Sequence, residues 1–137
     1  MKRKDLQQLS ALRLREAKLL LQANCPDGAY YLAGYAAECA IKACIAKATE
    51  RHEFPDKKRA ESSYTHNAVD LIRVAGLNKA LHSAITGDSN FAEAWEVVRQ
   101  WSEAERYERH SIEEAETLIV ALSDRKHGIL RWLKQFW

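Results

Sequence analysis

The chain has 137 residues, 47% of them hydrophobic and 29% charged, which is the composition of an ordinary soluble globular protein. Its formal net charge of +2 is too small to mark it as a nucleic-acid-binding protein. With only two prolines and five glycines, the sequence favours helices over a β-sandwich or barrel. We therefore expect a single helical domain over residues 1–137.

Charge is distributed unevenly along the chain. Residues 1–24 carry six Lys or Arg against two acidic residues, and residues 88–116 carry nine acidic residues against three basic ones. The last fourteen residues are again basic, with four Lys or Arg and one Asp. Blocks of this kind are typical of solvated helix faces, and faces of opposite sign complement each other across a dimer.

The cysteines and the apolar segments bear on localisation. The three cysteines have no metal-ligand spacing, and an odd number without a pairing framework indicates a reducing compartment. No apolar segment with a small-residue cleavage site follows the basic N-terminus, so we expect no signal peptide. Glu38 and Lys42 interrupt the apolar run of residues 29–48, which argues against a membrane span. We expect a cytoplasmic protein without a bound metal or cofactor.

Helical periodicity predicts the first elements. A first helix spans residues 5–24, where leucines and alanines recur at helical spacing. The sequence NCPDG breaks this pattern, and Asp27 is a suitable N-cap for a second helix over residues 28–49. The charged stretch of residues 50–64 is expected to be a loop.

The second helix is the most informative element. Residues 29–48 include eight alanines, one glycine and two cysteines, and a helix that is apolar on nearly every side packs at the centre of a protein. One of its sides carries small residues that let a neighbouring backbone approach closely: Ala33, Ala36, Ala40 and Ala43. Another stripe carries larger and polar residues: Tyr31, Tyr35, Glu38 and Lys42.

The middle of the chain predicts three more helices. The first covers residues 65–76, with Thr65 as its N-cap and Gly76 at its C-terminal end. A short helix covers residues 78–85, and another covers residues 91–105, with the turn sequence GDSN between them.

The last helix has the clearest local signal. Ser111 and Glu114 form a capping box, and apolar residues then recur at helical spacing as far as Leu133. The long helices with short connections predict an all-α protein, an up-and-down four-helix bundle with one or two short accessory helices. The apolar C-terminal sequence WLKQFW is expected to pack on a loop or to dock in a homodimer.

Three segments of the chain carry a family pattern: YYLAGYAAECAIKA, THNAVDLIRVAGL and WSEAERY. Together they resemble the HEPN superfamily of small helical-bundle proteins, over nearly the whole chain. The most specific matches are residues 34–38 and 41–43, His66 with Asp70 and Leu71, and Arg106 with Tyr107. The resemblance implies a HEPN-like bundle that forms a homodimer. Many HEPN proteins are metal-independent RNase toxins paired with a nucleotidyltransferase antitoxin, and others bind nucleotides, nucleic acid or protein.

The nuclease motif of that family is an arginine, then four to six residues, then a histidine, at the start of the last long helix. Here only three residues separate Arg106 from His110, one fewer than in that pattern. If the pair is catalytic, His110 serves as acid or base on the 2′-hydroxyl and Arg106 stabilises charge on the phosphate. In the alternative interpretation, Arg106 is a structural ion-pair partner, for instance of Glu38, and His110 is a solvated loop residue.

A polar cleft is the second candidate site. Glu38 and Lys42 are four residues apart on one helix face, in the order that favours an ion pair. With Arg106 they are candidates to line a binding cleft, together with His66 and Tyr107. The alternative is a local bridge between Glu38 and Lys42 that holds the helix packing, with His66 merely tolerated at the start of its helix.

Three functions remain open. The first is a homodimeric HEPN module that binds a nucleotidyltransferase partner, a nucleotide or nucleic acid, with a degenerate Arg106–His110 motif. The second is an active, metal-independent RNase toxin of a toxin–antitoxin system that uses both residues. The third is a structural dimerisation bundle. The short spacing between Arg106 and His110 favours the first.

Overall fold

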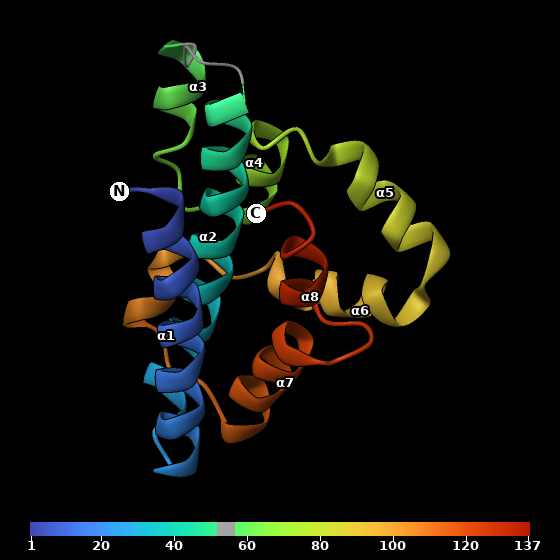
Figure 1. Cartoon of the computed structure of the whole chain (residues 1–137). Coiled ribbons are helices and arrows are strands. Elements are labelled where there is room, and N and C mark those ends of the chain that lie inside the picture. The colour runs from blue at the N-terminus through green and yellow to red at the C-terminus, as the bar shows by residue number, and fades with distance from the viewer. Residues whose placement is uncertain (52–56) are drawn as a thin grey trace.

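The computed structural model describes residues 1–51 and 57–137. These residues form helices and no strand, so the all-α prediction is confirmed. In chain order the elements are α1 (Arg3–Gln22), α2 (Pro26–Arg51), α3 (Lys57–Ser62), α4 (Ala68–Val74), α5 (Asn78–Gly87), α6 (Ser89–Val98), the 3-10 helix η1 (Glu103–Tyr107), α7 (Ile112–Ser123) and α8 (Ile129–Leu133) (Figure 1).

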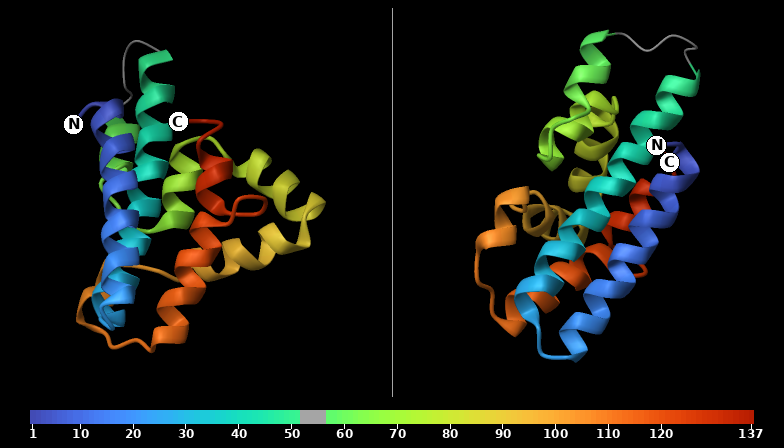
Figure 2. Two further views of the ribbon diagram at one scale, coloured as in Figure 1. Left: turned by 60° about the horizontal axis from the view of Figure 1, so that its bottom comes forward. Right: turned by 90° about the vertical axis from the view of Figure 1, so that its left-hand side faces the viewer.

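The two longest helices, α1 and α2, form an antiparallel hairpin (Figure 2). Asn24 lies in the turn between them with a φ of 63°, a left-handed conformation that Asn adopts more readily than most residues. α2 then begins at Pro26, whose fixed φ suits the first turn of a helix. Asp27 therefore lies inside the first turn and is not the N-cap that the sequence suggests.

The small-residue helix α2 is the centre of the molecule, as predicted. It packs against α1, α4, η1, α7 and α8. Because its alanines add little bulk, α1 and the other helices approach its backbone closely, and the Ser10 hydroxyl on α1 donates a 2.7 Å hydrogen bond to the Ala36 carbonyl. Five of its alanines are fully buried: Ala29, Ala33, Ala36, Ala40 and Ala43.

Side-chain caps fix the starts of the shorter helices. α4 begins after Asn67, whose Oδ1 accepts a hydrogen bond from the Asp70 backbone N–H at 3.1 Å, so Thr65 is not the cap. Gly76 follows α4 with a φ of 74°, which confirms it as the left-handed residue beyond that helix. A helix break at GDSN is also confirmed, but it is shorter than predicted: Gly87 ends α5, and Asp88 caps α6 through the backbone N–H groups of Asn90 and Phe91.

Two predicted boundaries in the middle of the chain are wrong. The helix expected over residues 91–105 ends at Val98, and a separate 3-10 helix follows once Trp101 has turned into the core. The loop expected over residues 50–64 contains the helix α3, and α2 extends into it as far as Arg51. Residues 52–56 of that predicted loop lie outside the described residues.

The single last helix is also wrong, because it is broken into α7 and α8. Asp124 ends α7, and its Oδ1 accepts hydrogen bonds from the backbone N–H groups of Lys126 and His127 at 2.9 and 2.7 Å. Gly128 closes the turn so near to the Asp124 backbone that any side chain there would overlap it. α8 is thereby folded back onto α7, α6 and α2.

The apolar C-terminus packs on its own chain. Trp132 and Leu133 are buried, and the ring of Phe136 meets the Trp132 ring edge-on with centroids 5.3 Å apart. The amide of Gln7 on α1 donates a 2.8 Å hydrogen bond to the carbonyl of Trp137. These contacts hold the chain end against α1, although the sequence suggests a loop or a second copy as its partner.

Candidate functional site

A buried carboxylate, Glu38, lies at the middle of α2. Its side chain is only 4% exposed, and its Oε1 is 2.9 Å from Lys42 Nζ and 2.6 Å from His66 Nδ1. Lys42 comes from the next turn of α2, whereas His66 comes from the segment before α4. The predicted pair of Glu38 and Lys42 therefore forms, and the burial of Glu38 makes both partners necessary.

The other side of His66 continues this network toward η1. His66 Nε2 is 3.0 Å from Glu103 Oε2, and the guanidinium of Arg106 binds the other carboxylate oxygen of Glu103. Both imidazole nitrogens of His66 thus face a carboxylate oxygen, one from α2 and one from η1. Polar side chains therefore connect α2, the start of α4 and η1. We call these five residues the Glu38 network: Glu38, Lys42, His66, Glu103 and Arg106.

Arg106 lies at the exposed end of the Glu38 network. Its guanidinium carbon is 5.7 Å from the centre of the Tyr31 ring and 5.5 Å from that of Tyr107, within the range of cation–π attraction. Tyr107 is 80% exposed and bounds the network on the solvent side. Arg106 is thus an ion-pair partner, as one interpretation of the sequence has it, but its partner is Glu103 instead of Glu38.

Glu103 is the member of the network that sequence reasoning missed. It lies three residues before Arg106, in the segment that was expected to be the end of an α-helix. One turn of 3-10 helix places residues three apart on the same side, so Glu103 meets Arg106 within η1 and still reaches His66. The sequence signal that could have identified Glu103 is its position three residues before Arg106, where an acidic residue can pair with the arginine.

His110 is held in a different environment. Its ring stacks on Tyr30 with centroids 3.7 Å apart, and its nitrogens lie 2.8 Å from Glu105 and 2.9 Å from Glu114. Its backbone N–H donates a 2.6 Å hydrogen bond to Asp27. The side chain is only 8% exposed, so the interpretation of His110 as a solvated residue is wrong.

The two residues of the nuclease-like motif therefore contact different partners within one chain. Arg106 binds Glu103 and borders Tyr31, whereas His110 binds Glu105 and Glu114 and stacks on the preceding Tyr30. The pKa of Tyr30 is raised, mainly by burial and in addition by the nearby carboxylates of Glu105 and Glu114. His110 thus anchors the start of α7 to α2.

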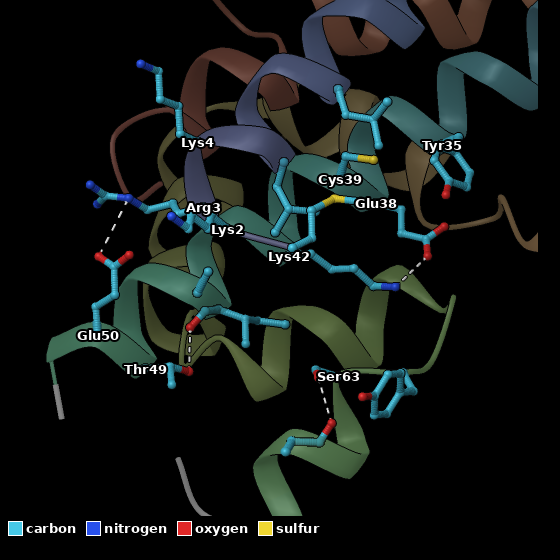
Figure 3. A pocket seen from close by; sticks show the side chains of 17 residues that line it. Lys2, Arg3, Lys4, Tyr35, Glu38, Cys39, Lys42, Thr49, Glu50 and Ser63 are labelled. Carbon is cyan, nitrogen blue, oxygen red and sulfur yellow. Dashed lines mark hydrogen bonds and ion pairs between the residues drawn. The ribbon is translucent and has the colours of Figure 1, made fainter. Parts of the chain in front are cut away.

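A cavity of about 730 Å³ opens beside the buried end of the network, between the start of α1, α2 and α3. Glu38, Lys42 and Tyr35 line one end, and Lys2, Arg3 and Lys4 line the other (Figure 3). Most of the wall between the two ends is apolar: Leu6, Leu9, Cys39, Ile45 and Ala46. The cavity thus combines cations and a carboxylate at each end, Glu38 at one and Glu50 at the other, with an apolar wall.

Charges at the two ends of the cavity are balanced differently. Lys42 is paired with Glu38, and Arg3 Nε lies 3.8 Å from Glu50 Oε2 across the opening.

Burial raises the pKa of the Tyr35 hydroxyl and raises that of the Cys39 thiol to about 12, with the Glu38 charge adding to both. Both side chains are therefore uncharged near neutral pH and serve as hydrogen-bonding or apolar wall.

Of the six residues that the sequence proposes, Glu38 and Lys42 line this cavity, while His66 and Arg106 join it only through the Glu38 network.

In the described part of the chain, no group of three His, Cys, Asp or Glu side chains is arranged to hold a metal ion. Nor does any helix within residues 1–51 and 57–137 have the length and apolar character that a membrane span requires. Comparison with protein-family models, curated proteins and solved structures gives no match for this chain.

Proposed function

We propose that this chain is a HEPN-like binding module: a homodimer, built on a four-helix-bundle plan, that takes a nucleotide or a nucleic-acid end in the cavity beside Glu38 and Lys42. A nucleotidyltransferase is the protein partner that the resemblance implies. The observation that carries the proposal is the cavity itself, whose volume of about 730 Å³ suits a nucleotide-sized ligand. Lys2 and Lys4 at its opening and Lys42 at its inner end offer cations to a phosphate, and its apolar wall offers a surface for a base.

The position of the family-like segments supports the same site. The segments that resemble HEPN proteins are far apart in the sequence, yet Glu38, His66 and Arg106 from each of them meet in one network. Burying the charge of Glu38 costs desolvation free energy. Apolar side chains packed at the same place are often as stable as a buried ion pair, so stability alone does not require the network. Its position beside a cavity is consistent with a role in ligand binding.

The placement of Arg106 and His110 favours binding over cleavage. A metal-independent RNase needs a histidine that can reach the substrate and an arginine that faces the same phosphate. Here both nitrogens of His110 are occupied by carboxylates, and Arg106 is bound by Glu103. The RNase toxin remains the alternative, and it requires that RNA displace these partners.

Titration calorimetry with ATP, GTP and a 5′-phosphorylated RNA hexamer tests the binding proposal. We expect Lys42→Gln to weaken binding by about tenfold or more, since a charge-assisted hydrogen bond to phosphate is lost. Lys47→Gln is the matched control, because Lys47 is exposed on the same helix and does not line the cavity. A double variant at the opening, Lys2→Gln with Lys4→Gln, should weaken binding without touching the buried pair.

Two further measurements separate the alternatives. Light scattering should give the mass of two chains. An RNase assay in EDTA, with Arg106→Ala and His110→Ala in parallel, should show no cleavage. Cleavage that both substitutions abolish would establish the RNase instead. If none of the ligands binds, or if Lys47→Gln weakens binding as much as Lys42→Gln, the cavity is not the site.

A further inference from the structure

A second hollow, of about 440 Å³, lies on another part of the surface, between α1, the α7–α8 turn and α8. Its floor is formed by Leu14, Leu122 and Leu130. Four exposed cationic side chains surround it, from segments more than a hundred residues apart in the sequence: Lys18, Arg125, Arg131 and Lys134. We call these four residues the basic rim. It is separate from the Glu38 cavity and shares none of its residues.

The described residues do not neutralise the basic rim. Among the described residues, no carboxylate lies within ion-pair distance of any of its four members: Arg131 donates to the Lys126 carbonyl, and Lys134 lies over the Trp137 ring. The one acid at the hollow, Asp124, is engaged by the backbone N–H groups of His127 and Lys126, which lower its pKa. Elsewhere, several arginines pair with an acid three residues away: Arg13, Arg73, Arg99 and Arg106.

The positive surface continues past the hollow. Arg131 also lines a neighbouring hollow of about 220 Å³, to which Lys126 contributes together with Asp88, a carboxylate that is bound by His127. The cations therefore follow a path across α8, which suits a ligand with several negative charges in a row better than a single phosphate. Two of the rim residues are arginines, whose planar guanidinium groups bind phosphate oxygens in pairs.

The floor of the hollow offers little to an apolar ligand. Leu122 is fully buried and Leu130 is 5% exposed, so the core already covers both side chains, and Leu14 is the one floor residue that is partly exposed. Protein partners and membrane-inserting ligands need an exposed apolar centre. No aromatic ring lines this hollow, and the surface therefore lacks a platform on which a base could stack. Recognition here has to depend on charge.

We propose that the basic rim binds the phosphodiester backbone of nucleic acid, by charge and without regard to base sequence. This proposal is independent of the Glu38 cavity and of any nuclease activity. Backbone binding of this kind releases counterions, and affinity falls with salt in proportion to the number of phosphates contacted. Four contacts to a single strand predict a slope of about −2.8 in a plot of log K against log salt.

Fluorescence anisotropy with labelled twenty-nucleotide oligo(U), oligo(dT) and a mixed-sequence RNA tests this proposal, at salt concentrations from 50 to 300 mM. We expect all three oligonucleotides to bind with similar affinity. Lys18→Gln combined with Arg125→Gln should reduce the slope to about half, since two of four contacts are removed. Neither residue makes a side-chain bond within the described chain, so the double variant should fold normally.

The matched control is Arg15→Gln combined with Arg109→Gln, which removes the same charge from exposed positions outside the hollow. This control should keep the original slope and affinity. Equal losses in both double variants would show that only net charge matters and would overturn the site. No binding at 50 mM salt would overturn it as well. Tighter binding to anionic vesicles or to poly-glutamate than to the oligonucleotides would replace nucleic acid with a membrane or an acidic protein as the occupant.

Discussion

The indole of Trp101 lies directly on Gly34 of α2, where a side chain of any size would overlap ring atoms of the tryptophan. Trp101 is buried, and its ring is 5.8 Å from that of Tyr31 on the same face of α2. Because Trp101 immediately precedes η1, its docking on Gly34 sets how closely η1 approaches α2. The contact therefore determines whether Glu103 and Arg106 can complete the Glu38 network.

Substituting Gly34→Ala should destabilise the protein. In an exposed helix interior, Ala would be more favourable than Gly by about 1 kcal/mol, but here the added methyl group displaces a buried indole. We expect a net loss of about 1–3 kcal/mol in the free energy of unfolding, measured by urea denaturation. Gly87→Ala is the control, since nothing lies near its Cβ position, and it should change stability little. A Gly34→Ala variant as stable as the wild type would contradict the close packing.

The buried pair of Glu38 and Lys42 predicts non-additive mutational effects. Lys42→Met removes one partner of a carboxylate that is 4% exposed, and breaking such a pair costs about 3 kcal/mol. Adding Glu38→Gln to Lys42→Met removes the uncompensated charge, so the double variant should recover part of the loss. Urea unfolding of the two single variants and the double variant gives the coupling free energy. Additive losses would mean that the two residues are stabilised independently.

Stability in acid should depend on carboxylates at helix ends. The hydrogen bond from His110, followed by those of Ser111, holds the pKa of Glu114 below its ordinary value, and the bond from His127 does the same for Asp88. A carboxylate with a lowered pKa stabilises the fold above its unfolded-state pKa. That contribution is lost as the pH falls through the lower, folded-state value.

The melting temperature should therefore fall as the pH drops below about 4.5, the ordinary pKa of a glutamate. Glu114→Gln should lower the melting temperature at pH 6 and flatten this acid dependence, because its titrating group is gone. Glu116→Gln, at an exposed position of the same helix, is the control and should leave the curve unchanged. If the melting temperature falls equally steeply in acid for Glu114→Gln and the wild type, other groups govern the acid dependence. Thermal scans followed by circular dichroism provide the measurement.

Much of the fold follows from local sequence signals. The alanine-rich run identifies α2 as the central helix, and Ser111 with Glu114 marks the start of α7. Periodicity fails at the end of α7, because Ile129 and Leu133 repeat the spacing of Leu118 and Leu122 although the helix is broken between them. The break depends on backbone N–H bonds to the Asp124 carboxylate and on a close approach of Gly128 to the Asp124 backbone, which are local turn features that helical periodicity does not register.

Only part of the candidate site can be predicted from the sequence pattern. Glu38 and Lys42 can be paired from their spacing on one helix, and the structure forms that pair. The bridge through His66 to Glu103 joins segments that are far apart in the chain, and helical spacing carries no information about it. His110 precedes an N-cap and so looks exposed, but the ring of Tyr30 from α2 covers it.

The three cysteines should differ sharply in reactivity. The thiolate is the reactive form, and burial raises the pKa of Cys39 and of Cys44 to about 12, while Cys25 is exposed in the α1–α2 turn. At pH 8, a thiol reagent such as Ellman's reagent should modify one cysteine quickly and the other two only after unfolding. Cys25→Ser should remove the fast reaction. Fast modification of two thiols in that variant would mean that the α1–α2 contact opens readily, since Cys39 also lines the cavity beside α1.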